Sequence, residues 1–315
     1  MKISLITTVL NEENSIGVFL DSILKQTKLP DEVVIVDGGS TDKTVSSIKY
    51  YVSSVNQLKI RLIIKRGNRS VGRNTAIKNS IGDVIAVSDS GCRLDKNWLA
   101  EITRPFSDKN IDVVAGYYKP KTNSIFEKSL ATYTCVMPDR ADPENFLPSS
   151  RSVAFRKSAW DNVGGYPEEL DTCEDLVFDK KLKKAGLKFH FAKNAIVHWP
   201  QRKNIFQAAK QFMGYAIGDG QVLYIRPQTP LLFARYIFGT VLVVLYLITN
   251  STLLLSIIYY LVAVYLVWSV WKNYKYVKHP EAFLYLPLLQ ITSDVAVILG
   301  MTIGLVSRIG GSTNL

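Results

Sequence analysis

The N-terminal part of the chain alternates between short apolar runs and stretches in which apolar residues recur every three or four positions. The runs are residues 3–10, 32–36, 60–65 and 83–88, and their length is typical of buried strands. Residues 16–27, 44–52 and 72–80 lie between or after these runs and are predicted to be helices. Strands that alternate with helices predict an α/β domain with a mostly parallel, doubly wound, Rossmann-like sheet.

Polar residues directly follow three of the predicted strands. Asn11 comes after the first strand, Asp37 after the second and Asp89 after the fourth. A doubly wound sheet binds its ligand outside the carboxyl ends of the strands, so we expect these side chains to lie near one site. Asn11 is also a favourable N-cap residue for the helix that follows it.

The C-terminal part of the chain is apolar over much longer distances. Residues 231–249, 252–271 and 282–306 form three stretches, each near the length of about 20 residues that a membrane-spanning helix needs. The sequence therefore predicts an α/β domain at residues 1–200, an interfacial helix or linker at 201–229 and a membrane region at 230–315. Residues 204–223 have helical spacing and basic neighbours, and either lie in the membrane surface or pack on the α/β domain.

Charged and aromatic residues indicate how the membrane region is oriented. Lys272, Lys275 and Lys278 follow the second stretch, and a basic loop of this kind stays in the cytosol. The first apolar run is too short for a signal peptide. We therefore expect a multi-pass protein of the cell membrane with a cytoplasmic α/β domain. An interfacial aromatic belt is expected from Trp268, Trp271, Tyr274, Tyr276 and Tyr285.

One acidic residue, Asp294, lies near the middle of the third apolar stretch. A lone carboxylate in lipid costs about 2.5 to 3.5 kcal/mol, so its side chain is expected to face protein or water. Two interpretations are open. Asp294 either hydrogen-bonds to a neighbouring helix, or contacts a lipid head group through a cation or water.

The composition excludes some classes of site. Three cysteines, with no Cys-x-x-Cys pair, argue against a disulfide framework and a zinc site. The formal charge of +11 is not accompanied by a nucleic-acid-binding motif, so we expect no nucleic-acid partner. Anionic lipid and a diphosphate substrate account for the basic excess as well.

Several short motifs occur in a specific order along residues 3–200. They are Thr8-Val9-Leu10-Asn11-Glu12, Val36-Asp37-Gly38-Gly39-Ser40-Thr41-Asp42, Gly72-Arg73-Asn74, Gly82-Asp83, Asp89-Ser90-Gly91 and Glu174-Asp175. In order and spacing this set resembles the motifs of family 2 glycosyltransferases with the GT-A fold. The resemblance implies a nucleotide-sugar-binding catalytic domain. It also implies sugar transfer to a membrane-associated acceptor, such as a polyprenyl- or lipid-linked saccharide, in the synthesis of cell-surface polysaccharide.

The same resemblance assigns residues to the donor site. Thr8, Glu12, Asp37, Arg73 and Asp89 are expected to bind the nucleoside diphosphate sugar. Asp37 would accept hydrogen bonds from the base or ribose, although an aspartate there also suits a turn. Asp89 stands where the family has Asp-x-Asp, and would hold Mn²⁺ or Mg²⁺ with diphosphate oxygens and water completing the shell.

The resemblance makes Asp175 the general base toward the acceptor, beside Glu174, in an inverting reaction. The alternative is structural, because Thr172 and Asp175 have the spacing of a helix N-cap. His198 is either a second metal ligand or a structural histidine. Arg151, before another apolar run, is a candidate for a lipid phosphate.

Two other functions fit parts of the sequence. A processive polysaccharide synthase would also combine such a domain with membrane helices, but residues 211–215 read Gln-Phe-Met-Gly-Tyr and not Gln-x-x-Arg-Trp. A catalytically inactive, membrane-tethered nucleotide-binding protein would explain the missing second carboxylate after Asp89.

The expected topology can be tested by labelling with a membrane-impermeant thiol reagent. A cysteine at Asn250, between the first two apolar stretches, should react from outside intact cells, whereas one at Asn273 should react only after permeabilisation. The reverse pattern would overturn the assignment of sides.

Overall fold

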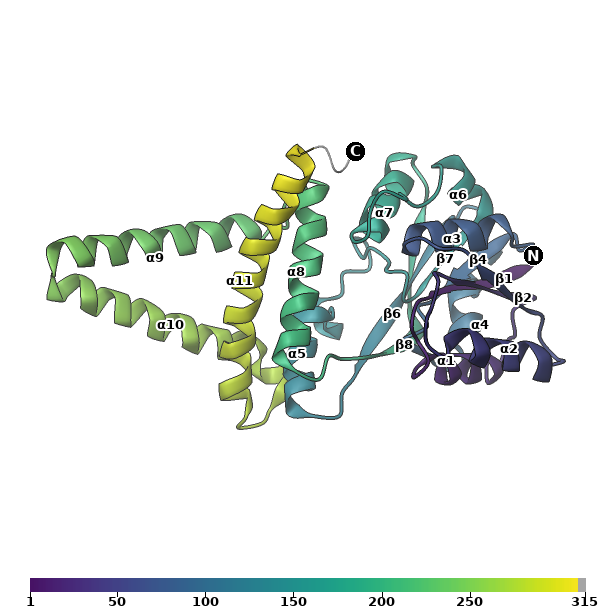
Figure 1. The fold of residues 1–315 in the computed structure, drawn as a ribbon, viewed down its shortest axis with the longest axis horizontal. Coiled ribbons are helices and arrows are strands. Elements are labelled where there is room, and N and C mark those ends of the chain that lie inside the picture. Colours follow the sequence, from purple (N-terminus) through teal and green to yellow (C-terminus); the bar gives the residue numbers. More distant parts are fainter. Residues whose placement is uncertain (311–315) are drawn as a thin grey trace. The chain divides into compact units, whose positions relative to one another are not determined.

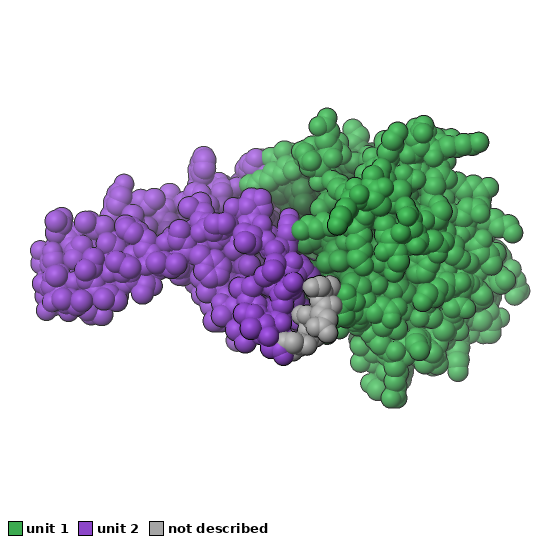
Figure 2. Space-filling model, turned by 90° about the horizontal axis from the view of Figure 1, so that it is seen from above, with its two compact units in different colours: residues 1–121, 135–200 green, residues 122–134, 201–315 purple. Residues whose placement is uncertain are grey.

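The computed structural model describes residues 1–310, which divide into two compact units. Unit 1 contains residues 1–121 and 135–200, and unit 2 contains residues 122–134 and those from 201 onward (Figure 2). The last change of unit falls at the expected end of the α/β domain. Residues 122–134, expected within that domain, group instead with the C-terminal unit. Residues 311–315 of the predicted membrane region lie outside the described residues.

Unit 1 is built on an eight-stranded sheet of order β3-β2-β1-β4-β7-β6-β8-β5 (Figure 1). The predicted strands are β1 (Ile3–Val9), β2 (Glu32–Asp37), β3 (Ile60–Ile64) and β4 (Val84–Val87). All three pairings among them are parallel. Strands β1, β2 and β4 are almost wholly buried, as their continuous apolar character predicts.

The other half of the sheet was not predicted in detail. It contains β5 (Arg93–Leu94), β6 (Val113–Lys121), β7 (Val153–Arg156) and β8 (Phe189–Pro200). Strand β7 is antiparallel to both β4 and β6, whereas β6 and β8 are parallel with a register shift after Gly116. The fold is therefore a mixed α/β sheet that continues a Rossmann-like parallel half.

The helices of unit 1 are α1 (Ile16–Leu24), α2 (Thr44–Ser54), α3 (Arg69–Lys78), α4 (Trp98–Thr103), α6 (Lys157–Asn162) and α7 (Glu174–Lys184). Helix α3 begins before the predicted residue 72, because the Asn68 side chain caps the amide of Val71. The N-cap of α1 is Ser15 and not Asn11. Asn11 adopts a left-handed conformation with φ of 55° and accepts a hydrogen bond from the Thr41 amide at 2.9 Å.

Unit 2 consists of helices. They are α5 (Ile125–Thr134), α8 (Ile205–Gln221), α9 (Thr229–Thr249), α10 (Thr252–Val277) and α11 (Ala282–Ile309). Within residues 1–310, α9, α10 and α11 are the three helices long and apolar enough to cross a membrane. Asp294 is 4% exposed and accepts hydrogen bonds from Arg235 of α9 and Tyr265 of α10. It therefore faces protein, as expected.

Candidate active site

The ends of β1 and β2 and the loops after them lie together. The amide of Asn11 donates to Ser40 Oγ at 2.8 Å, and that of Glu12 donates to Thr44 Oγ1 at 2.7 Å. Glu12 also accepts a hydrogen bond from Ser15 Oγ. The predicted donor-site residue Glu12 thus belongs to a loop that is joined to the loop after Asp37.

Asp37 has one anchored and one unpartnered carboxylate oxygen. Its Oδ1 accepts hydrogen bonds from the amides of Gly39 and Ser40, each at 2.9 Å, in a turn where Gly39 has a φ of 105°. Its Oδ2 is buried and has no hydrogen-bond partner within residues 1–310. The turn interpretation is therefore correct for one oxygen, and the other is a buried acceptor without a partner in the described residues.

A close approach at Gly72 brings the start of α3 to the end of β1. A Cβ on Gly72 would lie 2.6 Å from Thr8 Cγ2, so a larger residue would push the helix away. The next residue, Arg73, is thereby held at the strand ends. The predicted residues Thr8 and Arg73 are neighbours for this reason.

Arg73 is the centre of an ionic cluster and is only 2% exposed. Its Nη1 donates to Glu174 Oε1 at 2.8 Å and to Asp175 Oδ1 at 3.1 Å. Its Nη2 donates to Asp89 Oδ1 at 3.2 Å. One guanidinium therefore joins the predicted metal ligand to the predicted general base, although the two are far apart in the sequence.

The cluster shifts the pKa values of Asp89 and Glu174 in opposite directions. Burial would raise the pKa of Asp89, but the charges of Arg73 and Arg151 hold that pKa below its ordinary value. Burial and the adjacent Asp175 raise the pKa of Glu174. The two carboxyl groups on the same guanidinium therefore have pKa values shifted in opposite directions, lower for Asp89 and higher for Glu174.

The acidic pair does not act as a helix cap. Residue Cys173, with a φ of 63°, occupies the N-cap position of α7 and makes no side-chain capping bond. The interpretation of Thr172 as an N-cap residue is therefore wrong. Glu174 and Asp175 lie in the first turn, where carboxylates suit the helix dipole, and their side chains bind Arg73.

Two residues complete the surroundings of Asp175. Ser150 donates to Asp175 Oδ2 from its amide at 3.0 Å and to Oδ1 from its hydroxyl. The ring of Tyr166 lies under Arg73, with 5.4 Å between Arg73 Cζ and the ring centroid. Sequence reasoning assigned no role to either residue. The Ser-Ser-Arg-Ser run at residues 149–152 is the sequence feature that could have indicated a role for Ser150.

Asp89 has the properties of a single carboxylate ligand for a divalent cation. The side chain is 37% exposed, and Oδ1 is held by Arg73. Oδ2 has no hydrogen-bond partner among residues 1–310. Asp89 therefore fits a metal that takes one protein carboxylate and completes its shell with substrate oxygens and water.

His198 lies in β8, opposite Arg93 of β5. Its Nε2 is 3.9 Å from Asp95 Oδ2, and burial and the charge of Arg93 lower its pKa. No interaction joins it to Asp89 in the described part of the chain, and no group of three metal-ligating side chains occurs there. The structure does not bring these two predicted ligands into one cluster.

Arg151 lies beside the acidic cluster, and its guanidinium packs on two aromatic rings. Its Cζ is 3.8 Å from the ring centroid of Trp199 and 5.5 Å from that of Tyr118. The Nη1 atom donates to Ser149 Oγ at 2.9 Å. Because its charge also lowers the pKa of Asp89, Arg151 adds positive potential at the strand ends.

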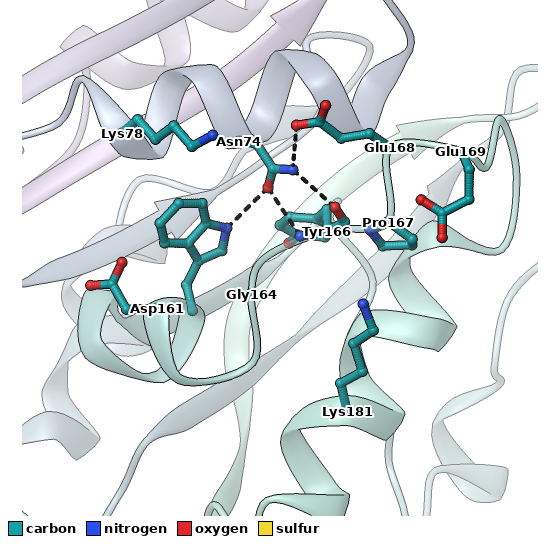
Figure 3. Close-up of a pocket in the computed structure, with 10 residues that line it drawn as sticks. Asn74, Lys78, Asp161, Gly164, Tyr166, Pro167, Glu168, Glu169 and Lys181 are labelled. Atoms are coloured by element: carbon teal, nitrogen blue, oxygen red, sulfur yellow. Dashed lines mark hydrogen bonds between the residues drawn. The ribbon is translucent and has the colours of Figure 1, made fainter. Parts of the chain in front are cut away.

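Asn74 has a structural role on another face of α3 (Figure 3). It donates to the Tyr166 carbonyl and to Glu168 Oε1, both at 2.9 Å, and accepts from Trp160 Nε1 at 3.0 Å. These bonds hold the loop at 164–168 beside an open hollow of about 470 Å³. None of the predicted site residues lines this hollow. Asn74 instead helps to place Tyr166 under Arg73.

The fold is similar to that of known glycosyltransferases. The mannosyltransferase PcManGT from Pyrobaculum calidifontis, solved in complex with GDP-Man and Mn²⁺, has a TM-score of 0.69 at 17% identity, covering 96% of this chain and 87% of that chain. Staphylococcus aureus TarS has a TM-score of 0.52 at 22% identity, covering 68% and 40%. The protein therefore has a GT-A fold, followed by apolar helices.

Sequence relatives lead to the same class. Residues 4–160 match Glycosyl transferase family 2. Glycosyltransferase AglE of Haloferax volcanii is 26% identical over 70% of this chain and 73% of AglE. The O-antigen chain rhamnosyltransferase RfbN of Salmonella typhimurium is 27% identical over 62% of this chain and 66% of RfbN. The chain is a family 2 glycosyltransferase, as its motifs predicted.

The buried Asp179, one turn after Asp175, gives a test of these electrostatics. Burial and the charge of Asp175 raise its pKa well above the ordinary value, and its Oδ2 has no partner within residues 1–310. A raised pKa contributes stability at low pH that is lost as the pH rises through the folded-state pKa. Asp179→Asn should therefore gain thermal stability relative to wild type as the pH rises above about 4, the ordinary pKa of an aspartate.

Thermal unfolding of both proteins across this pH range checks the prediction. The exposed Asp171→Asn is the matched control and should show no such trend. A constant difference between wild type and Asp179→Asn would mean that Asp179 is not held in its neutral form.

Proposed function

We propose that the protein is an inverting glycosyltransferase that moves a sugar from a nucleoside diphosphate sugar to a membrane-associated saccharide acceptor. The observation that carries this proposal is the Arg73 cluster. It holds Asp175, the proposed base, and Asp89, the proposed metal ligand, on one guanidinium. Donor and acceptor chemistry would thus meet at the ends of the strands.

The donor's nucleoside would bind at Asp37 and its diphosphate near Asp89. The unpartnered Asp37 Oδ2 is suited to accept hydrogen bonds from the base or ribose, with Thr8 and Glu12 in the adjoining segments. Arg151 would meet negative charge of the diphosphate through charge-assisted hydrogen bonds. PcManGT, the structural neighbour described above, was solved with GDP-Man and Mn²⁺, which supports a donor of this class.

A divalent cation, Mn²⁺ or Mg²⁺, is proposed to join the donor at Asp89. When bound, it would stabilise the negative charge that develops on the leaving diphosphate. Asp89 would hold this cation with its free Oδ2. His198 would be a second ligand only if substrate binding brought it and Asp89 together.

Asp175 is proposed to take the proton of the acceptor hydroxyl. As the acceptor oxygen bonds to the anomeric carbon, the bond to the diphosphate breaks and the proton moves to the carboxylate. Ser150 and Arg73 would orient Asp175, and Glu174 would act through Arg73 as a positioning residue. Attack opposite the leaving group inverts the anomeric configuration.

The acceptor is proposed to be a polyprenyl- or other lipid-linked saccharide at the cytoplasmic face of the cell membrane. Three helices apolar enough to cross a membrane support a membrane location. Relatives that include an O-antigen rhamnosyltransferase and the poly(ribitol-phosphate) β-N-acetylglucosaminyltransferase TarS support a role in cell-surface glycan synthesis.

Replacing the proposed base should separate transfer from donor binding. Asp175→Asn keeps the shape of the side chain but removes the proton acceptor, so the transfer rate should fall by about 10²- to 10⁴-fold. Donor affinity, measured by calorimetry, should persist. Glu174→Gln is the matched control and should have the milder effect.

Proton NMR of the product tests the stereochemical part of the same mechanism. An α-linked donor should give a β-linked product. Retention of configuration, or an Asp175→Asn enzyme that works at the wild-type rate, is incompatible with the proposal.

The proposed metal site predicts a different defect. Asp89→Asn should abolish the metal-dependent increase in donor affinity, because an amide is a weaker ligand than a carboxylate for Mn²⁺ or Mg²⁺. Calorimetric titration of the nucleoside diphosphate with and without Mn²⁺ measures this increase, and His198→Ala tests the second ligand in parallel. Unchanged metal dependence in Asp89→Asn would remove Asp89 from the metal site.

A further inference from the structure

Helix α11 packs along α8 for most of its length. Their shared apolar cluster includes Ala208, Phe212, Leu289 and Ala296. Further along, a Cβ on Gly304 would lie 2.2 Å from the Ile217 carbonyl oxygen, so the two backbones are in direct contact. At the ends of the helices, Arg308 Nη1 donates to the Gln221 carbonyl at 2.7 Å. The two helices therefore keep a fixed orientation to each other, so the orientation of one in a membrane determines that of the other.

Helix α8 is short and polar for a membrane-spanning helix. Its 17 residues rise about 25 Å, less than the hydrocarbon thickness of about 30 Å. It exposes Lys210, and its Asp219 forms an ion pair with Arg226. An amphipathic helix of this kind is suited to the membrane surface, and α11 packs along it.

The α9–α10 hairpin gives independent evidence of how deep α11 lies in the bilayer. Arg235 lies near the start of α9 and Lys272 near the end of α10, so both mark the base of the hairpin. Both contact the middle of α11, where Asp294 accepts from Arg235 and Gln290 accepts from Lys272. Figure 1 shows the hairpin leaving the α8–α11 pair near its middle and not running beside it.

Aromatic residues beside Arg235 and Lys272 indicate that the base of the hairpin lies at the membrane–water interface. The ring centroid of Trp268 is 4.3 Å from Lys272 Nζ and 5.7 Å from Arg235 Cζ. Tryptophan and tyrosine are enriched where lipid meets water, and long basic side chains reach toward that region. From this level, residues 252–271 of α10 rise about 30 Å to the tip of the hairpin, enough to cross the bilayer.

An upright α11 conflicts with this depth. With Asp294 at the interface, the following residues 295–309 reach only about 22 Å into the bilayer, and the exposed Leu284 and Leu288 lie in water. With Asp294 at the bilayer centre, the hairpin, which leaves the side of α11, would lie within the plane of the membrane and would place its polar tip at Asn250 and Ser251 in the hydrocarbon. A flat α11 avoids both outcomes.

We propose that α11 lies in the membrane surface beside α8, and that the α9–α10 hairpin alone is inserted across the bilayer. This departs from the third span that hydropathy predicts. The face of α11 in contact with acyl chains is the exposed row Leu284, Leu288, Ile291, Val295, Leu299, Ile303 and Val306. Both ends of α11 then lie on the same side of the membrane as the basic loop at 272–279.

Relative labelling of two cysteines tests the proposal without assuming which side is cytosolic. His279→Cys reports the basic loop and suits labelling better than Asn273, which is only 1% exposed. Ile309→Cys reports the end of α11 and is 85% exposed in the native protein. In the full-length chain with Cys92, Cys135 and Cys173 replaced, both positions should react from the same side, and Asn250→Cys from the other.

Labelling of Ile309→Cys from the side of Asn250 would show that α11 crosses the membrane and would overturn the proposal. A sidedness reporter fused to the C-terminus of the chain with its native cysteines gives the same comparison if the cysteine-free protein does not fold. Neither readout depends on glycosyl transfer, so a failure here is distinct from failure of the proposed function.

The depth of labelled positions in the bilayer is the second measurement that tests the proposal. Fluorophores on Leu288→Cys and Leu299→Cys, in vesicles containing anionic phospholipid, should be quenched most by lipids labelled near the head group. A fluorophore on Val264→Cys, within the hairpin, should be quenched most by lipids labelled deep in the acyl chain. Deep quenching at both α11 positions would contradict a surface location.

Discussion

The buried charge of Arg73 is the interaction on which the site depends. A guanidinium that is 2% exposed is stable only if carboxylates surround it, and Asp89, Glu174 and Asp175 supply them from separate parts of the chain. Removing one partner of a buried ion pair costs about 3 to 5 kcal/mol. The need to satisfy Arg73 therefore fixes the end of β4 and the start of α7 around α3.

The carboxylates of the site are anchored differently from one another. Asp37 and Asp89 each use one oxygen in protein contacts and leave the other available among residues 1–310. Asp175 has protein partners on both oxygens. Anchoring fixes the direction of each side chain before a ligand arrives, and in the proposed mechanism the second oxygens of Asp37 and Asp89 would receive the donor groups.

Local sequence predicted the parallel half of the sheet, because its strands are continuous apolar runs ended by Asn11, Asp37 and Asp89. It did not predict the antiparallel strand β7, whose position depends on pairing with distant strands. Motif order selected Arg73, Asp89, Glu174 and Asp175, which the structure brings together, but it did not predict their contacts. The bonds from Ser150 to Asp175 and the helix start at Cys173 depend on tertiary packing, which periodicity does not encode.

The grouping of α5 with the C-terminal helices has a consequence for how this architecture can be recombined. The chain passes between the two units at three places, after residues 121, 134 and 200. A chimera joined only at residue 200 would place α5 of one parent against the C-terminal helices of another, where Tyr133 must bond to the Leu286 carbonyl. The segments of the two units thus alternate along the chain, and a chimera that exchanges one unit must take both of its segments from the same parent.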